Sequence, residues 1–85
     1  MAREQFYVEV TDTFAGDANY CWVNRYLVSA STQRGAISKV ARATGYRFRR
    51  AWSDCESARY DARGARVCAF VTPNDWAPRE GCAEL

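Results

Sequence analysis

The 85-residue chain has no histidine, only one methionine and only two prolines. Histidine is the commonest general base in enzymes, so its absence removes the usual partner of a nucleophilic serine or cysteine. No hydrophobic stretch approaches the ~20 residues that a membrane-spanning helix needs. The N-terminal segment MAREQFYVEV carries charges where an export signal has an apolar block, which favours a cytoplasmic protein.

Four cysteines are present, and none of them forms a CxxC pair. Their spacing matches no zinc-finger or zinc-ribbon pattern, and the missing histidines leave only cysteine and carboxylate as metal ligands. In a cytoplasmic setting thiols stay reduced. We therefore expect four unbridged, metal-free thiols and no cofactor: Cys21, Cys55, Cys68 and Cys82.

The net charge of +2 is small for a nucleic-acid-binding domain, which usually has a larger basic surplus. Among the twelve basic residues, all except Lys39 are arginines. Arginine offers a planar fork for carboxylate, phosphate or aromatic partners. A GC-rich genome would produce the same bias without any functional demand.

Residues 6–11 alternate between apolar and polar side chains, which predicts a half-buried strand. Residues 20–29 predict a second strand, and the turn formers at 15–19 suggest a hairpin between the two. Ser31 or Thr32 can cap a following helix that ends at Gly45. The apolar stripe of this helix consists of Ala36, Ile37, Val40, Ala41 and Thr44.

Three further strands are expected at residues 46–52, 59–62 and 66–72. The ββαββ order predicts an α+β fold: an antiparallel sheet of four to five strands with one helix packed on one face. We expect a single domain over residues 1–72 and an irregular tail over residues 73–85, because Pro78 and Gly81 interrupt regular structure there.

The alternation of side chains along the second strand predicts which residues lie beneath the helix. Ile37, Val40 and Ala41 should be buried against Phe48 and against Trp22, Tyr26 or Val28. These three lie on the bulkier strand face, which also carries Tyr20 and Asn24. In the third strand, Arg50 and Trp52 share a register with Phe48, whereas Arg47 and Arg49 point to the opposite side. The sheet face away from the helix is left uncovered.

No catalytic constellation is visible, so we expect no enzymatic activity. The glycines are isolated rather than clustered in a phosphate-binding loop, and Asp54 and Glu56 lie in a polar loop typical of solvated charges. Tryptophan, tyrosine and arginine are the residue types enriched at interface hot spots. The predicted partner-binding residues are Arg25, Arg47, Arg49, Arg50, Trp52 and Trp76. The alternative for the arginines is a solvated strand face whose aliphatic stems cover apolar surface.

The segment NYCWVNRYLVSASTQRGAISKVARATGYRFRR, residues 19–50, resembles small accessory proteins of bacteriophages and mobile elements. The resemblance rests on a strand of the type NYxWVxRY that leads into a capped helix; the matching positions are Asn19, Tyr20, Trp22, Val23, Arg25 and Tyr26. This class includes anti-CRISPR proteins, which act by binding CRISPR effectors. Many of those are strongly acidic DNA mimics, and this chain is not acidic.

The sequence thus predicts a non-catalytic binding protein without a membrane segment, encoded by a phage. It would inhibit a host defence ribonucleoprotein complex in the host cytoplasm by blocking a surface on this larger partner. The alternative is a small nucleic-acid-binding domain whose arginines and aromatic rings contact bases and phosphates on a sheet face.

Overall fold

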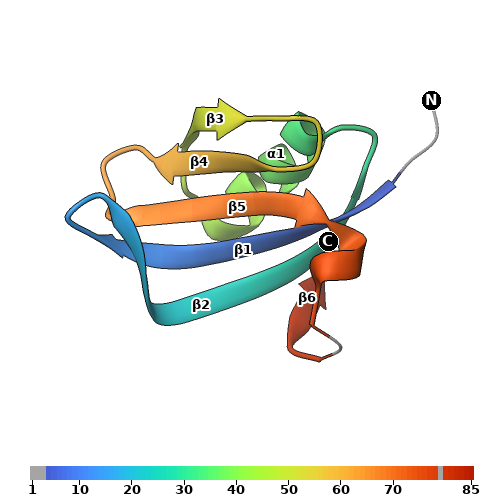
Figure 1. Ribbon diagram of the computed structural model, residues 1–85, viewed down its shortest axis with the longest axis horizontal. Coiled ribbons are helices and arrows are strands. Elements are labelled where there is room, and N and C mark those ends of the chain that lie inside the picture. The colour runs from blue at the N-terminus through green and yellow to red at the C-terminus, as the bar shows by residue number, and fades with distance from the viewer. Residues whose placement is uncertain (1–3, 79) are drawn as a thin grey trace.

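The computed structural model of the protein describes residues 4–78 and 80–85. Within them, one helix packs against one face of a six-stranded sheet (Figure 1). The strands lie in the order β3-β4-β5-β1-β2-β6. The elements are β1 (Glu4–Phe14), β2 (Asp17–Ala30), α1 (Gln33–Thr44), β3 (Phe48–Ser53), β4 (Ala58–Ala62), β5 (Val67–Pro73), a 3-10 turn (Asn74–Trp76) and β6 (Cys82–Glu84).

The α+β class is confirmed, whereas the ββαββ order and the antiparallel sheet of four to five strands fit only in part, because four strands follow the helix in the described residues. The sheet is mixed, because β6 pairs in parallel with β2 and all other neighbours are antiparallel. The tail is therefore not irregular throughout: it forms the 3-10 turn and then β6. Leu85, which follows β6, donates its N–H to the carbonyl of Leu27 at 2.8 Å. A three-residue strand is too short to show an alternating pattern, so local periodicity could not predict it.

Helix α1 begins and ends where the capping signals placed it. Thr32 is the N-cap, and its hydroxyl accepts a hydrogen bond from the N–H of Gly35 at 3.0 Å. At the other end Gly45 adopts φ 83°, a left-handed conformation that glycine takes at little cost, and its N–H bonds to the carbonyl of Ala41. The helix buries Ala36, Ile37 and Val40, as its apolar stripe predicted, whereas Ala41 is only partly buried.

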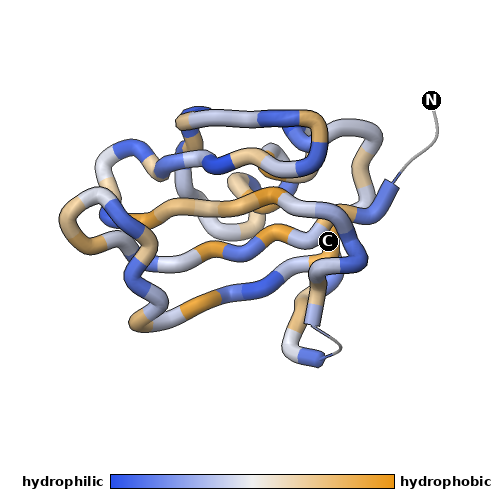
Figure 2. Tube along the Cα trace, in the orientation of Figure 1, coloured by the Kyte–Doolittle hydropathy of each residue, from blue (hydrophilic) through white to orange (hydrophobic). Residues whose placement is uncertain are grey.

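The core lies between α1 and the sheet and is built mainly from small aliphatic side chains of the central strands. Figure 2 shows hydrophobic positions recurring along β1 and β5. Val8, Val10 and Val71 have no exposed surface, and Tyr26 and Phe48 pack at the margin. Burial of this apolar surface is the main stabilising contribution for the fold.

Two aromatic residues predicted beneath the helix lie elsewhere. Tyr20 and Trp22 keep 53% and 39% of their surface exposed. The cause is an irregularity in the β1–β2 pairing: Thr11 pairs with Val23 but Thr13 pairs with Ala18, so β2 has extra residues at this point. Extra residues on one strand break the alternation of side chains and change the face to which they point. No helix in the described ranges is long and apolar enough to cross a membrane.

Candidate functional site

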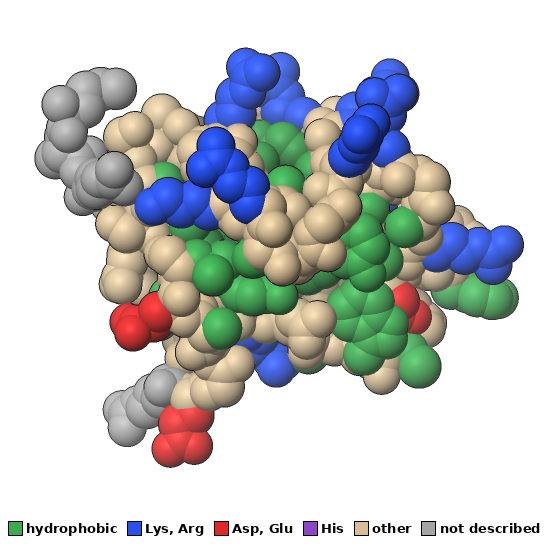
Figure 3. All heavy atoms as spheres, turned by 180° about the vertical axis from the view of Figure 1, so that it is seen from behind, with side chains coloured by type: hydrophobic (Ala, Val, Ile, Leu, Met, Phe, Trp, Pro, Cys, Tyr) green, Lys and Arg blue, Asp and Glu red, His purple; other side chains and the backbone are tan. Residues whose placement is uncertain are grey.

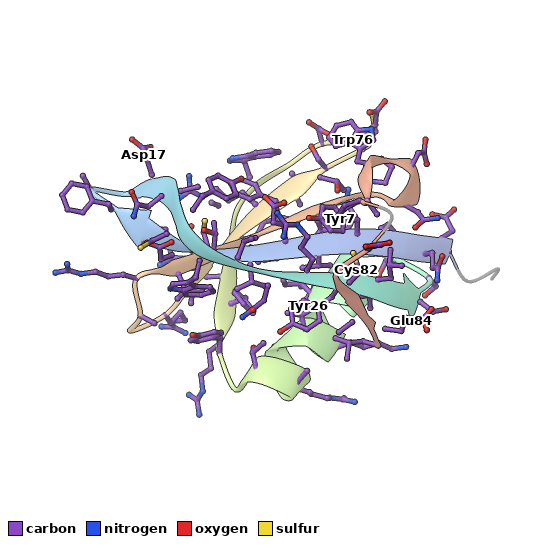
Figure 4. The ribbon with its side chains drawn as sticks, turned by 90° about the horizontal axis from the view of Figure 1, so that it is seen from below. Tyr7, Asp17, Tyr26, Trp76, Cys82 and Glu84 are labelled. Carbon is purple, nitrogen blue, oxygen red and sulfur yellow. The ribbon has the colours of Figure 1, made fainter. Side chains whose placement is uncertain are left out.

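The sheet has one face that α1 leaves uncovered, called here the open face. Cross-strand neighbours share a face, so the register places Glu9, Arg25, Phe70 and Arg59 side by side across four strands of it. Figure 4 shows Tyr7 on this side of the sheet and Tyr26 on the helix side. The open face therefore carries both large rings and charges.

A groove of about 400 Å³ lies on the open face, in the size range of small-molecule pockets. Apart from Glu9, Ser57 and Thr72, its lining is aromatic. We call it the aromatic groove; its lining residues are Tyr7, Glu9, Tyr20, Trp52, Ser57, Phe70, Thr72 and Trp76. Three of its rings are strongly exposed, Trp52 at 46%, Tyr20 at 53% and Trp76 at 57%. Such a concentration of exposed aromatic surface is typical of interaction sites.

Tyr20 reaches the groove because of the irregularity in β2. Its backbone has φ 55°, a left-handed conformation that non-glycine residues rarely adopt. The buried Thr11 hydroxyl accepts the N–H of Tyr20 at 3.1 Å and donates to the carbonyl of Trp22 at 2.9 Å. Asp12 accepts the N–H of Cys21 at 2.8 Å and the Asn19 amide at 2.9 Å. These bonds replace the interrupted strand ladder and hold the Tyr20 ring over the open face.

Trp52 reaches the groove through a second irregularity, between Arg50 and Trp52. Arg50 pairs with Tyr60 on the helix side, but Trp52 pairs with Arg59 on the open face. The expectation that Trp52 shares the side of Phe48 is therefore wrong, because the extra residue Ala51 inverts the alternation. Trp76 comes from the 3-10 turn after β5, and Figure 4 shows it on the same side of the sheet as Tyr7.

The charged groups of the open face are largely paired. The Nε of Arg25 lies 4.0 Å from Glu9 Oε2, and the Nε of Arg59 lies 3.0 Å from Asp61 Oδ1. Arg59 also donates to the carbonyl of Gly16 at 2.7 Å, and its guanidinium carbon lies 5.8 Å from the centre of the Phe70 ring. Arg25 and Arg59 are thus already engaged by carboxylates, a carbonyl and a ring.

Glu9 shapes the electrostatics of the groove. The Tyr7 hydroxyl donates a 2.7 Å hydrogen bond to Glu9 Oε2. Burial, followed by this hydrogen bond and the charge of Glu9, raises the pKa of Tyr7 far above its ordinary value. Burial and then hydrogen bonding to Glu9 raise the pKa of Tyr20 to about 12. The neutral form of both hydroxyls, which can donate toward the carboxylate, is therefore favoured.

Of the six predicted binding residues, the structure brings Trp52 and Trp76 together in the groove and places Arg25 beside its Glu9. Arg49 lies opposite Asp61 on the open face. Arg50 points to the helix side, where it lines a separate hollow with Arg34, Phe48 and Tyr60. Arg47 precedes β3, is exposed, and accepts the N–H of Arg63 at its carbonyl, outside the groove.

Sequence reasoning missed Tyr7, Glu9, Tyr20 and Phe70 as site residues. Alternation alone puts Tyr7 and Glu9 on the side of β1 opposite Val8, and Phe70 on the side of β5 opposite Val71. These residues can be assigned to one site only when β1 and β5 are known to be neighbours, with Glu9 opposite Phe70. That pairing joins distant parts of the chain and has no local signature.

The described residues contain no group of three or more histidine, cysteine, aspartate or glutamate side chains arranged to hold a metal ion. The four cysteines are unbridged, and Cys68 is buried, which raises the pKa of its thiol. Comparison with family models, with curated proteins and with solved structures finds no match for this chain.

Proposed function

We propose that this protein is a non-catalytic binding protein that docks a larger protein partner on its open face, with the aromatic groove at the centre of the contact. The observation that carries the proposal is the exposure of Tyr20, Trp52 and Trp76 around one groove. Tryptophan and tyrosine dominate the binding energy of protein interfaces. Exposing three such rings disfavours solubility unless a partner covers them.

The charges of the open face favour a protein over a nucleic acid at this site. Nucleic-acid affinity comes largely from unpaired basic groups that neutralise phosphates. Here Arg25 and Arg59 lie against Glu9 and Asp61, and the first of these carboxylates lines the groove. A phosphate backbone laid across the groove would meet this negative charge.

The resemblance of residues 19–50 to phage accessory proteins supports a more specific form of the proposal. In that form the partner is a host defence ribonucleoprotein complex, and the protein inhibits it in the manner of an anti-CRISPR protein by blocking a surface. Arg25, which lies 4.0 Å from Glu9, and Arg49 elsewhere on the open face would supply polar contacts to this partner.

Nucleic-acid binding is the second candidate function. One observation favours it, on the helix side of the molecule rather than on the open face. Arg34 and Arg50 line a hollow of about 270 Å³ with Phe48 and Tyr60, and no ion pair joins either arginine to a carboxylate in the described ranges. Figure 3 shows lysine and arginine side chains spread over this helix side of the molecule. Binding there would fall steeply with salt, because counterions are released from the phosphates.

Site-specific photo-crosslinking tests the proposed protein contact. p-Benzoylphenylalanine replaces Trp52 or Trp76 in the groove, and in the control it replaces Trp22, an exposed tryptophan outside the groove lining. In a nuclease-treated bacterial lysate we expect one discrete protein adduct from the two groove positions and none from position 22. Equal adducts from position 22, or loss of the adduct after nuclease treatment, would contradict the proposal.

Mass spectrometry of the adduct separates the general proposal from its specific form. A subunit of a CRISPR effector supports the inhibitor function. Any other specific protein supports the binding function and excludes the anti-CRISPR form.

A further inference from the structure

The aromatic groove combines an acidic group with surrounding rings. The Glu9 side chain keeps 20% of its surface exposed and faces a groove lined by Tyr20, Trp52 and Trp76. A carboxylate offers about four acceptor positions. Tyr7, Tyr20 and the loosely placed Arg25, 4.0 Å away, occupy fewer than these. The groove therefore retains acceptor capacity that faces its interior.

The surrounding rings favour a positive charge as well. The face of an aromatic ring carries negative potential, so several rings around one space form a cage for a cation. Edge-to-face packing joins Tyr46 and Phe48 on the helix side at 6.0 Å, but no ring pair of this kind occurs among the groove residues in the part of the chain that the structure describes. The groove rings thus line a space instead of filling it. On the same face Arg59 already lies over the Phe70 ring.

We propose that the aromatic groove binds a cationic side chain, an arginine or lysine of the partner protein, between its rings and the carboxylate of Glu9. This inference rests on the proposed protein-binding function and specifies the chemistry of the contact. Charge complementarity carries it, because Glu9 is the one charged group among the described residues of the groove lining and it is negative. Arg25 acts as an internal competitor for the same carboxylate.

Titration with short blocked peptides tests the inference by NMR. The probe is Gly-Gly-Arg-Gly-Gly with both ends blocked, and the comparison peptide has neutral citrulline in place of arginine. The indole N–H signals of Trp52 and Trp76 report the groove, and that of Trp22 is an internal control. We expect saturable shifts of the two groove signals with the arginine peptide, and binding about tenfold weaker with the citrulline peptide.

Three variants sharpen the test. Glu9→Gln keeps an acceptor for the Tyr7 hydroxyl but removes the charge, so arginine-peptide binding should weaken about tenfold. The matched control Asp61→Asn removes a carboxylate of the open face that does not line the groove, and binding should stay unchanged. Arg25→Gln frees Glu9 from its competitor, so binding should strengthen by about two- to fivefold. Thermal melts check that each variant is folded.

Several outcomes overturn the inference. These are equal binding of both peptides, no effect of Glu9→Gln and Arg25→Gln, or no shift of the groove signals at tens of millimolar peptide, a concentration at which even millimolar dissociation constants would register. Titration with oligothymidylate gives the opposite sign for a nucleic-acid site, since Glu9→Gln would then strengthen binding. If the groove crosslinks a protein but these results fail, the proposed function stands without the cation contact. If the groove crosslinks nothing, the proposed function itself fails.

Discussion

The two faces of the sheet are formed by the same strands but differ in the size and exposure of their side chains. The face beneath α1 is filled by small aliphatic side chains such as Val8, Val10 and Val28, which have no exposed surface. The open face carries the larger rings of Trp52 and Tyr20, about half exposed and held by backbone irregularities and polar bonds. Side chains that stabilise the fold and side chains available to a partner are thus segregated by alternation along each strand.

The two faces also differ in the ion pairing of their arginines. On the open face Arg25 and Arg59 each lie within ion-pair distance of a carboxylate, whereas Arg34 and Arg50 on the helix side have no such partner in the described residues. Paired charges produce little net electrostatic field, whereas unpaired arginines produce a positive field. The open face therefore favours a contact defined by shape and local charge, and the helix side favours electrostatic attraction.

The largest expected effect comes from removing a core side chain beneath the helix. Ile37→Ala should lower the free energy of unfolding by about 3 kcal/mol, because it leaves a cavity in a tightly packed region. Trp52→Ala removes a larger side chain but one that is 46% exposed, so it should cost about 1 kcal/mol or less. Urea denaturation of both variants measures the difference. A larger loss for Trp52→Ala would show that the groove is part of the core and that the two faces of the sheet do not differ in this way.

A smaller effect separates the conformation of Tyr20 from its ring. Tyr20→Gly and Tyr20→Ala both delete the ring, but only glycine adopts φ 55° without strain. The glycine variant should therefore be more stable than the alanine variant by about 1 kcal/mol, and both should lose arginine-peptide binding. Chemical denaturation and the NMR titration provide the two measurements. Equal stability of the variants would mean that position 20 does not hold a left-handed backbone in solution.

The smallest effect concerns pH and the polar bonds that support the groove. Hydrogen bonding, first from Asn19 and then from the N–H groups of Trp22 and Cys21, lowers the pKa of Asp12 below its ordinary value of 3.8. Because its pKa is depressed in the folded state, the ionised Asp12 carboxylate stabilises the fold. This stabilisation is complete above the ordinary pKa and is lost as the pH falls through the folded-state pKa.

Thermal melts at pH 7 and below pH 4 measure this contribution. The Asp12→Asn variant should lose less of its melting temperature on acidification than the wild type does. Asp17→Asn, at the same hairpin, is the control for the loss of one surface charge. If Asp12→Asn and the wild type respond to acid alike, Asp12 does not hold the irregularity of β2 through its charge.

Local patterns in the sequence were enough to predict most of the secondary structure. The strand and helix regions up to residue 72 agree with the structure, and the cap residues Thr32 and Gly45 lie where the signals placed them. These features depend on neighbouring residues only. Strand β6 was not predicted, because it depends on pairing with β2 and has no sequence pattern of its own.

The candidate site was predicted less completely than the fold. Trp52 and Trp76 were chosen for their residue type, and both line the groove. Tyr20 was assigned to the core, but the structure leaves 53% of it exposed. Arg50 lies on the side of Phe48, as its register predicted, and therefore outside the groove. The alternation rule fails wherever a strand contains extra residues, as it does at Tyr20 and at Trp52.

The sequence by itself determined the class of the fold, the limits of the helix and which strand residues are apolar, because periodicity and capping act over a few residues. Only the tertiary structure decided that Glu9, Tyr20, Phe70 and Trp76 meet in one groove. Their meeting depends on the β1–β5 pairing, on the irregularity that turns Tyr20 and on the turn that places Trp76. These are contacts between distant parts of the chain, and the physical reason is that their free energy arises from packing and pairing across the whole domain and leaves no local pattern.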